Sequence, residues 1–131
     1  MKYLQSILLI IGILCSSASI AQWSTIDIND QYSVFVDKTT IKRNGNIVQM
    51  WELKDFKLAQ LGINEDSYLS SKIHSEYDCL ESNKRILTFV HFTENMGKGR
   101  VLNKVIYIDK WSPIATDKTI EKEWKVACRK N

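Results

Sequence analysis

The chain has 131 residues, of which 44% are hydrophobic and 25% are charged, and its formal net charge is +3. A nucleic-acid-binding domain would show a much stronger basic excess gathered into patches, whereas here both signs of charge are scattered, so we expect no nucleic-acid partner. The chain has one proline and no repeat or low-complexity tract, so no linker between domains is visible.

The start of the chain has the three zones of a cleavable secretory signal. Lys2 supplies the positive charge, an apolar run covers residues 7–14, and small residues follow as far as Ala21. The apolar run is much shorter than the roughly 20 residues that span a bilayer. We therefore expect a signal peptide over residues 1–21, a single mature domain over residues 22–131, and no transmembrane segment.

Cys15 lies just after the apolar run, where bacterial lipoproteins carry their lipid-bearing cysteine. Lipoprotein processing requires a small residue directly before that cysteine, and Leu14 stands there instead. We expect Cys15 to be removed with the signal, with a lipid anchor as the alternative. The protein is then exported to the periplasm, to the outer cell surface or into the medium.

Two cysteines survive removal of the signal, Cys79 and Cys128. In an oxidising compartment an even pair in a small exported domain indicates a disulfide, and two free buried thiols are the alternative. A bond between them would close a loop of about 49 residues, for which the loop-entropy model gives a stabilisation of up to roughly 4 kcal/mol.

Most of the mature chain has the two-residue period of β-strands. The segments that show it are residues 32–36, 41–44, 47–56, 68–80, 85–93 and 101–107. The dipeptide Asn44-Gly45 predicts a tight hairpin turn in which both residues have positive φ. A further turn is predicted at Asp37-Lys38 and a loop over residues 59–66. Strands joined by such short connections are antiparallel, so the sheet is predicted to be a meander.

The period changes after Pro113. Thr116 or Asp117 can cap a helix, and apolar residues then recur on one helical face at Ile120, Trp124, Ala127 and Cys128. The sequence therefore predicts an α+β domain in which an antiparallel meander of about six strands carries a C-terminal helix on one face. A bond from Cys128 to Cys79 would staple that helix to the sheet.

Signals for catalysis and metal binding are weak. The chain has no Gly-x-Ser-x-Gly turn, no zinc-type spacing and no phosphate-binding loop, and the Gly-x-Gly within residues 96–99 indicates only a hairpin loop. His74 and His91 fall on neighbouring predicted strands, and a metal site there would also need Glu76. We expect no enzymatic activity, no cofactor and no metal; a hydrolase that uses either histidine is the alternative.

Two sets of side chains are candidates for binding a partner. Basic residues around one predicted hairpin form the candidate protein-binding patch, namely Lys84, Arg85, Lys98, Arg100 and Lys104. Large aromatic residues are predicted to fill the core, with a carbohydrate-stacking platform as the alternative, and these are Trp23, Trp51, Trp111 and Trp124.

A series of short segments extends in order over nearly the whole mature chain. They are IKRNGN (41–46), WELKDF (51–56), SSK (70–72), EYDC (76–79), Arg85, GKG (97–99), WSPI (111–114) and WKVAC (124–128). In order and spacing this series resembles the surface-adhesin protein E family of Gram-negative bacteria. The resemblance implies a six-stranded antiparallel sheet, a C-terminal helix fastened by a disulfide, and no enzymatic activity.

The same resemblance carries an expectation about partners. The founding member of the family is an adhesin that binds host matrix and serum proteins such as vitronectin, laminin and plasminogen, and it can form dimers. We therefore expect an exported, non-enzymatic protein-binding module that can also form a homodimer. The alternative is a periplasmic housekeeping or envelope-stress domain that binds a small ligand or a bacterial partner.

The predicted signal can be tested by the mass of the exported protein. Expression in a Gram-negative host should give a chain that begins at Gln22, because Ala21 and the small residues before it suit signal peptidase. Intact mass spectrometry measures this, and Ala21→Arg should prevent the cut. A mature chain that begins at a lipid-modified Cys15 would contradict the prediction.

Overall fold

The computed structural model describes residues 21–129, so the predicted signal lies outside the described residues except for Ala21. The main sheet has six strands in meander order, namely β1 (Trp23–Ile28), β2 (Tyr32–Asn44), β3 (Ile47–Leu61), β4 (Ser67–Asp78), β5 (Asn83–Phe92) and β6 (Val101–Ile106). All neighbouring strands are antiparallel. The predicted meander is therefore confirmed.

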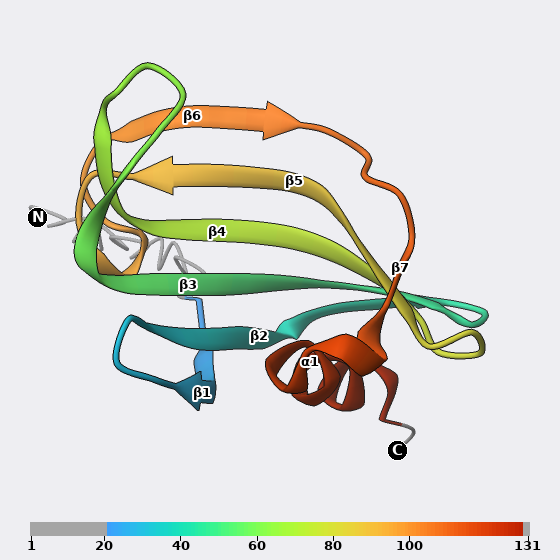
Figure 1. Ribbon diagram of the computed structural model, residues 1–131. Coiled ribbons are helices and arrows are strands. Elements are labelled where there is room, and N and C mark those ends of the chain that lie inside the picture. The colour runs from blue at the N-terminus through green and yellow to red at the C-terminus, as the bar shows by residue number, and fades with distance from the viewer. Residues whose placement is uncertain (1–20, 130–131) are drawn as a thin grey trace, which may run out of the picture.

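Short elements complete the domain after β5. A 3₁₀ turn, η1 (Asn95–Gly97), precedes β6, and the two-residue strand β7 (Ser112–Pro113) pairs with the start of β5. A second 3₁₀ turn, η2 (Ile114–Thr116), leads into the helix α1 (Lys118–Cys128). Figure 1 shows α1 on one face of the sheet, toward the β1 and β2 side, whereas β6 forms the opposite edge. We call the face that carries α1 the helix side of the sheet.

The hairpin between β2 and β3 is confirmed, but its predicted detail is wrong. Asn44 is the last residue of β2 and pairs with Ile47, so the two-residue loop is Gly45-Asn46. Only Gly45 has a positive φ, of 60°. This places glycine at the first loop position, where a two-residue hairpin of the II′ type requires it.

Other strand boundaries also differ from the prediction. The turn expected at Asp37-Lys38 is wrong, because β2 continues to Asn44 and only its register against β3 shifts between Asp37 and Lys42. The buried Asp37 carboxylate accepts a hydrogen bond from the Thr39 amide at 3.0 Å, which gives this polar side chain a local partner within the strand. The loop expected from residue 59 begins after Leu61, and β1 was not predicted.

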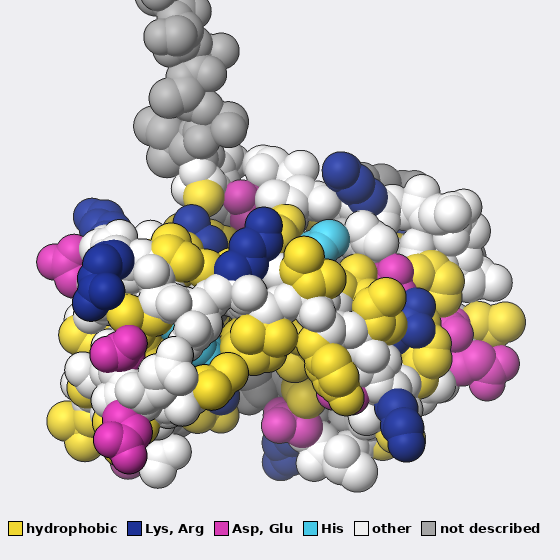
Figure 2. Space-filling view, turned by 90° about the horizontal axis from the view of Figure 1, so that it is seen from above, with side chains coloured by type: hydrophobic (Ala, Val, Ile, Leu, Met, Phe, Trp, Pro, Cys, Tyr) yellow, Lys and Arg dark blue, Asp and Glu magenta, His cyan; other side chains and the backbone are white. Residues whose placement is uncertain are grey.

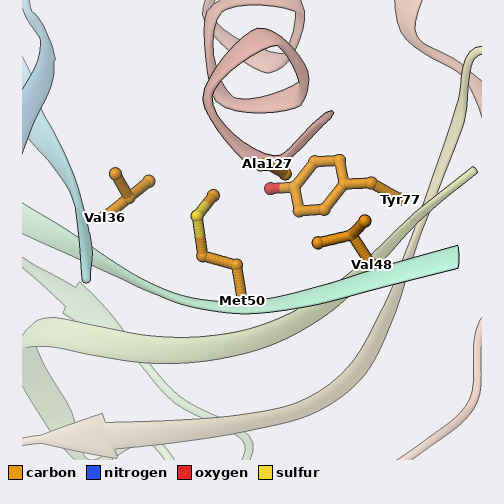
Figure 3. Packing of buried hydrophobic residues seen from close by; sticks show 5 residues of the cluster. All are labelled: Val36, Val48, Met50, Tyr77 and Ala127. Carbon is orange, nitrogen blue, oxygen red and sulfur yellow. The ribbon is translucent and has the colours of Figure 1, made fainter. Parts of the chain in front are cut away.

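The core lies between α1 and the sheet. Its central cluster is fully buried and consists of Val36, Val48, Met50, Tyr77 and Ala127. Figure 3 shows Tyr77 reaching from β4 toward Ala127 on α1, with side chains of β3 below the helix. Full burial of one large apolar side chain such as Met50 stabilises the fold by about 1.5–3 kcal/mol. Ala127 is small, which lets the helix approach the Tyr77 ring closely.

Both ends of α1 are fixed as the sequence predicts. At the start, the Asp117 carboxylate accepts hydrogen bonds from the amides of Thr119 and Ile120, at 2.8 and 3.2 Å. At the end, the Cys79 and Cys128 sulfurs are 2.06 Å apart, which confirms the disulfide. One turn before the disulfide, the Trp124 indole N–H donates to a β4 carbonyl at 3.0 Å.

The Gly-x-Gly segment lies in a loop that is hydrogen-bonded to the face of the sheet opposite α1. Asp55 accepts the Met96 amide at 2.7 Å, and the Ser70 hydroxyl accepts the Gly97 amide at 2.9 Å. Gly97 has φ 69°, and a Cβ there would lie 2.6 Å from Cε of Lys72. The Lys72 side chain could move aside, so it is the positive φ that favours glycine here, and the segment has a structural role.

Within residues 21–129, no helix combines the length and the apolar character that a membrane crossing requires.

Replacing both cysteines should measure how strongly the disulfide holds α1. The variant with Cys79→Ala and Cys128→Ala should lose about 2–4 kcal/mol in the free energy of unfolding, because the unfolded chain regains the freedom of a 49-residue separation. Urea denaturation followed by circular dichroism measures the loss. Reductant should destabilise the wild type and leave the variant unchanged; a loss below about 1 kcal/mol would contradict the expectation.

Candidate functional site

The structure divides the predicted basic patch between two ends of β5. Lys84 and Arg85 lie at the start of this ten-residue strand, and Lys98 and Arg100 lie beyond its end. At about 3.3 Å per residue, the two ends are roughly 30 Å apart. The five predicted residues therefore do not form one surface.

Lys84 is buried on the helix side of the sheet. Its ammonium lies 3.0 Å from the Glu52 carboxylate of β3 and 2.6 Å from the Glu123 carboxylate of α1. The Tyr77 hydroxyl also donates to Glu123, at 3.2 Å. We call Lys84, Glu52 and Glu123 the buried ion cluster. Its side chains are nearly inaccessible, so Lys84 cannot take part in a surface patch.

Burial and charge shift the pKa values in the buried ion cluster. Burial raises the pKa of Glu52 to about 8, against the opposing attraction of Lys84. Burial disfavours the charged form of Lys84, but Glu52 and Glu123 outweigh it and raise the Lys84 pKa. Oε1 of Glu52 has no hydrogen-bond partner among the described residues. Burial thus favours the protonated form of Glu52, whereas the neighbouring carboxyl groups favour the charged form of Lys84.

Arg85 points to the opposite face of the sheet. Its guanidinium lies 2.7 Å from the Glu76 carboxylate and 4.3 Å from the centre of the Trp111 ring. The Gln49 amide also donates to Glu76, at 3.0 Å. Arg85 is thus occupied by an ion pair and an aromatic ring.

The remaining basic residues, Lys98, Arg100 and Lys104, are exposed at the β6 edge of the sheet. Exposed apolar side chains lie in the same segment, with Val101 51% and Ile106 77% accessible. Figure 2 looks onto the molecule from the β6 side and shows hydrophobic side chains spread over this surface, with Lys and Arg among them. We call residues 98–108 the β6 edge.

The two histidines lie on opposite faces of the sheet. His91 pairs with Ser71, and its Nδ1 is 2.6 Å from the Ser71 hydroxyl. His74 instead stacks on Trp51, with ring centres 4.7 Å apart. Burial lowers the pKa of both imidazoles. A metal site shared by the two histidines is therefore excluded by the register, and residues 21–129 contain no group of three metal-binding side chains.

Of the four tryptophans predicted to fill the core, only Trp124 packs against its central cluster. The other three, Trp23, Trp51 and Trp111, are half-buried on the face opposite α1. The alternation of apolar and polar residues within each strand could not show on which face of the sheet each tryptophan lies, because both faces of β3 carry large side chains.

Two adjoining cavities lie on the helix side of the sheet, beside α1. Their volumes are about 190 and 250 Å³, and both are lined by Lys54, Ile73 and Ile86. The first borders the buried ion cluster; the second is walled largely by aromatic rings, namely Phe56, Tyr68, Phe89 and His91. We call the two cavities together the trough. Each cavity alone is smaller than the roughly 300–1,000 Å³ of typical ligand sites, and the two together fall within that range.

Ionisable groups with shifted pKa values gather around the trough. Burial lowers the pKa of Lys54, whose ammonium lies 3.9 Å from the centre of the Tyr32 ring. Burial raises the pKa of Tyr68, which stacks on His91 with ring centres 3.8 Å apart. Such clustering is typical of functional sites. The sequence did not reveal the trough, because its residues come from separate strands whose register had to be known.

Comparison with known protein families shows to which family the chain belongs. The family model described as "Surface-adhesin protein E" matches residues 23–129. The chain belongs to this family. It is thereby an adhesin-like protein, as the order of its motifs predicts. No curated protein matches the sequence significantly.

Solved structures of Haemophilus influenzae protein E share the fold of this family member. Crystal form II has 13% sequence identity and a TM-score of 0.62, with 84% of this chain and 96% of that chain covered. A second structure of the same protein has 12% identity and a TM-score of 0.60, with 83% and 92% covered. At such low identity the likeness establishes the fold.

The pKa of Glu52 predicts how stability depends on pH. The folded protein keeps a proton on Glu52 up to about pH 8, whereas the unfolded chain loses it near pH 4.5. The free energy of unfolding should therefore fall as pH rises through this window, by at most about 1.4 kcal/mol per pH unit.

Urea denaturation at a series of pH values tests this dependence. Glu52→Gln should flatten the curve, and the exposed Glu81→Gln should leave its slope unchanged. An equal slope in the wild type and in Glu52→Gln would contradict the assignment.

Proposed function

We propose that this family member is an exported, non-enzymatic binding protein that contacts another protein, such as a host matrix or serum protein, through the β6 edge. The observation that carries the proposal is the exposure of apolar and basic side chains together on an outer strand. Val101 and Ile106 project into solvent beside Lys98, Arg100 and Lys104. Isolated exposed apolar residues are ordinary, but Ile106, Tyr107 and Ile108 are exposed in succession, and a contiguous apolar patch indicates an interaction surface.

The backbone of β6 adds a second means of binding. β6 pairs with β5 on one side, and it stands last in the strand order of the main sheet. An extended segment of a partner can therefore add to the outer side of β6 by main-chain hydrogen bonds. The basic side chains would attract an acidic partner and speed its association, which makes binding sensitive to salt.

The contacts of the two histidines support a non-catalytic role. His91 contacts the Ser71 hydroxyl, yet among residues 21–129 no carboxylate hydrogen-bonds to its ring. A serine nucleophile normally needs a base that is itself oriented by a third group. His74 is held in a stack with Trp51 on the other face.

A second candidate function is favoured by the trough. A periplasmic domain that binds a small ligand would use this cavity rather than the β6 edge. The two functions differ in location, since only a protein displayed on the surface or released from the cell can meet host proteins.

Removing the charge of the β6 edge should weaken binding to a protein partner. The variant with Lys98, Arg100 and Lys104 changed to Ala should bind immobilised vitronectin, laminin or plasminogen at least about tenfold more weakly than the wild type, and its affinity should depend less on salt. Biolayer interferometry at low and physiological ionic strength measures both effects.

The matched control changes three exposed lysines elsewhere, Lys38, Lys57 and Lys118, to Ala. It alters the net charge equally and should bind like the wild type. Loss of affinity in both triple variants would indicate only an effect of net charge, and wild-type binding by the β6-edge variant would refute the proposed surface.

A further inference from the structure

We propose that the trough binds a small amphipathic carboxylate, whose anionic group pairs with Lys54 and whose apolar tail lies against Phe56, Ile73 and Phe89. This inference is independent of protein binding at the β6 edge. It concerns the trough on the helix side of the sheet and assigns to it one class of ligand.

The first argument is the position of the Lys54 ammonium. Lys54 lines both cavities, so it stands where they meet. It lies over the rings of Tyr32 and Phe56, at 3.9 and 5.5 Å from their centres. No carboxylate lies within ion-pair distance of it among residues 21–129. Glu123 and Asp117 attract it only from farther away.

The second argument is the charge balance around the trough. Lys84 also borders it, but Glu52 and Glu123 already contact its ammonium at 3.0 and 2.6 Å. Lys54 is therefore the cation of the trough that lacks a direct partner. A half-buried cation without a counter-ion loses hydration, and an anionic ligand group restores that interaction. The charge thus favours an anion over a neutral or cationic ligand.

The third argument is the chemistry of the walls beyond Lys54. Phe56, Ile73, Ile86 and Phe89 give the larger cavity an apolar lining, and the paired rings of Tyr68 and His91 close another side. The Ser71 hydroxyl and Nδ1 of His91 engage each other at 2.6 Å, so they offer less to a ligand. An apolar tail therefore suits this cavity. Its volume of about 250 Å³ suits a chain of medium length or a substituted aromatic ring.

The position of Lys54 also sets the orientation of the ligand. The carboxylate would lie at the junction of the cavities, over the rings of Tyr32 and Phe56, and the tail would extend away from α1 toward Tyr68 and His91. No residue of the β6 edge lines the trough. A ligand could therefore occupy the trough while a partner protein is bound at the edge.

Decanoate is a suitable probe, and decanol and decylammonium are matched neutral and cationic probes with the same tail. Isothermal titration calorimetry at pH 7 should show decanoate binding with a dissociation constant of about 1 mM or tighter, and weaker binding of the other two probes. Lys54→Met, which keeps an apolar stem, should weaken decanoate binding about tenfold and leave decanol within about twofold.

The matched control is Lys57→Met, which alters an exposed lysine on the same strand and should bind decanoate like the wild type. A wild-type measurement avoids dependence on variant folding: decanoate should shift the NMR resonances of Phe56, Tyr68 and His91. Equal affinity for decanoate and decanol, full affinity in Lys54→Met, or shifts confined to residues outside the trough would each overturn the proposal. Vitronectin binding should be unaffected by Lys54→Met, so failure here is distinguishable from failure of the β6-edge proposal.

Discussion

The ammonium group of Lys84 links the sheet to the helix α1. It lies between the carboxyl groups of Glu52 on β3 and Glu123 on α1, at 3.0 and 2.6 Å, in a site that water hardly reaches. Removing one member of a buried ion pair typically costs about 3–5 kcal/mol, because the other charge is left without compensation. If α1 left the sheet, Lys84 would lose its contact with Glu123. The ion cluster therefore fixes the middle of the helix, and the Cys79–Cys128 bond fixes its end.

The fixed position of α1 determines which surfaces remain available. An eleven-residue helix covers only part of a sheet whose longest strand has fifteen residues. The uncovered remainder of the helix side becomes the trough, with the ion cluster at one end and aromatic rings at the other. Because Lys84 is neutralised by the helix, Lys54 is left as the cation that faces this space. The same interaction that holds the helix thus shapes the electrostatics of the neighbouring cavity.

Local chemistry allowed much of the fold to be predicted from the sequence. Gly45, the apolar stripe ending at Cys128 and the Asp117 cap each act within a few residues, so each could be recognised from the sequence alone. The errors arose where a distant contact decides the outcome. Lys84 has the character of a surface residue until Glu52 and Glu123 are placed beside it. The trough was not predictable either, because its lining depends on the register of β3, β4 and β5.

The two outer strands of the sheet, β1 and β6, are protected to different degrees against pairing with strands of other molecules. At β1, a register shift follows Thr25, and the Asp27 carboxylate contacts Thr119 and Lys122 of α1 at 2.7 and 3.5 Å. β6 also has a register shift and carries Lys104, and both features oppose unselective strand pairing. Antiparallel pairing of β6 with β6 of a second copy would place like charges near one another, which is unfavourable. An acidic partner of the kind proposed for the β6 edge would instead compensate them.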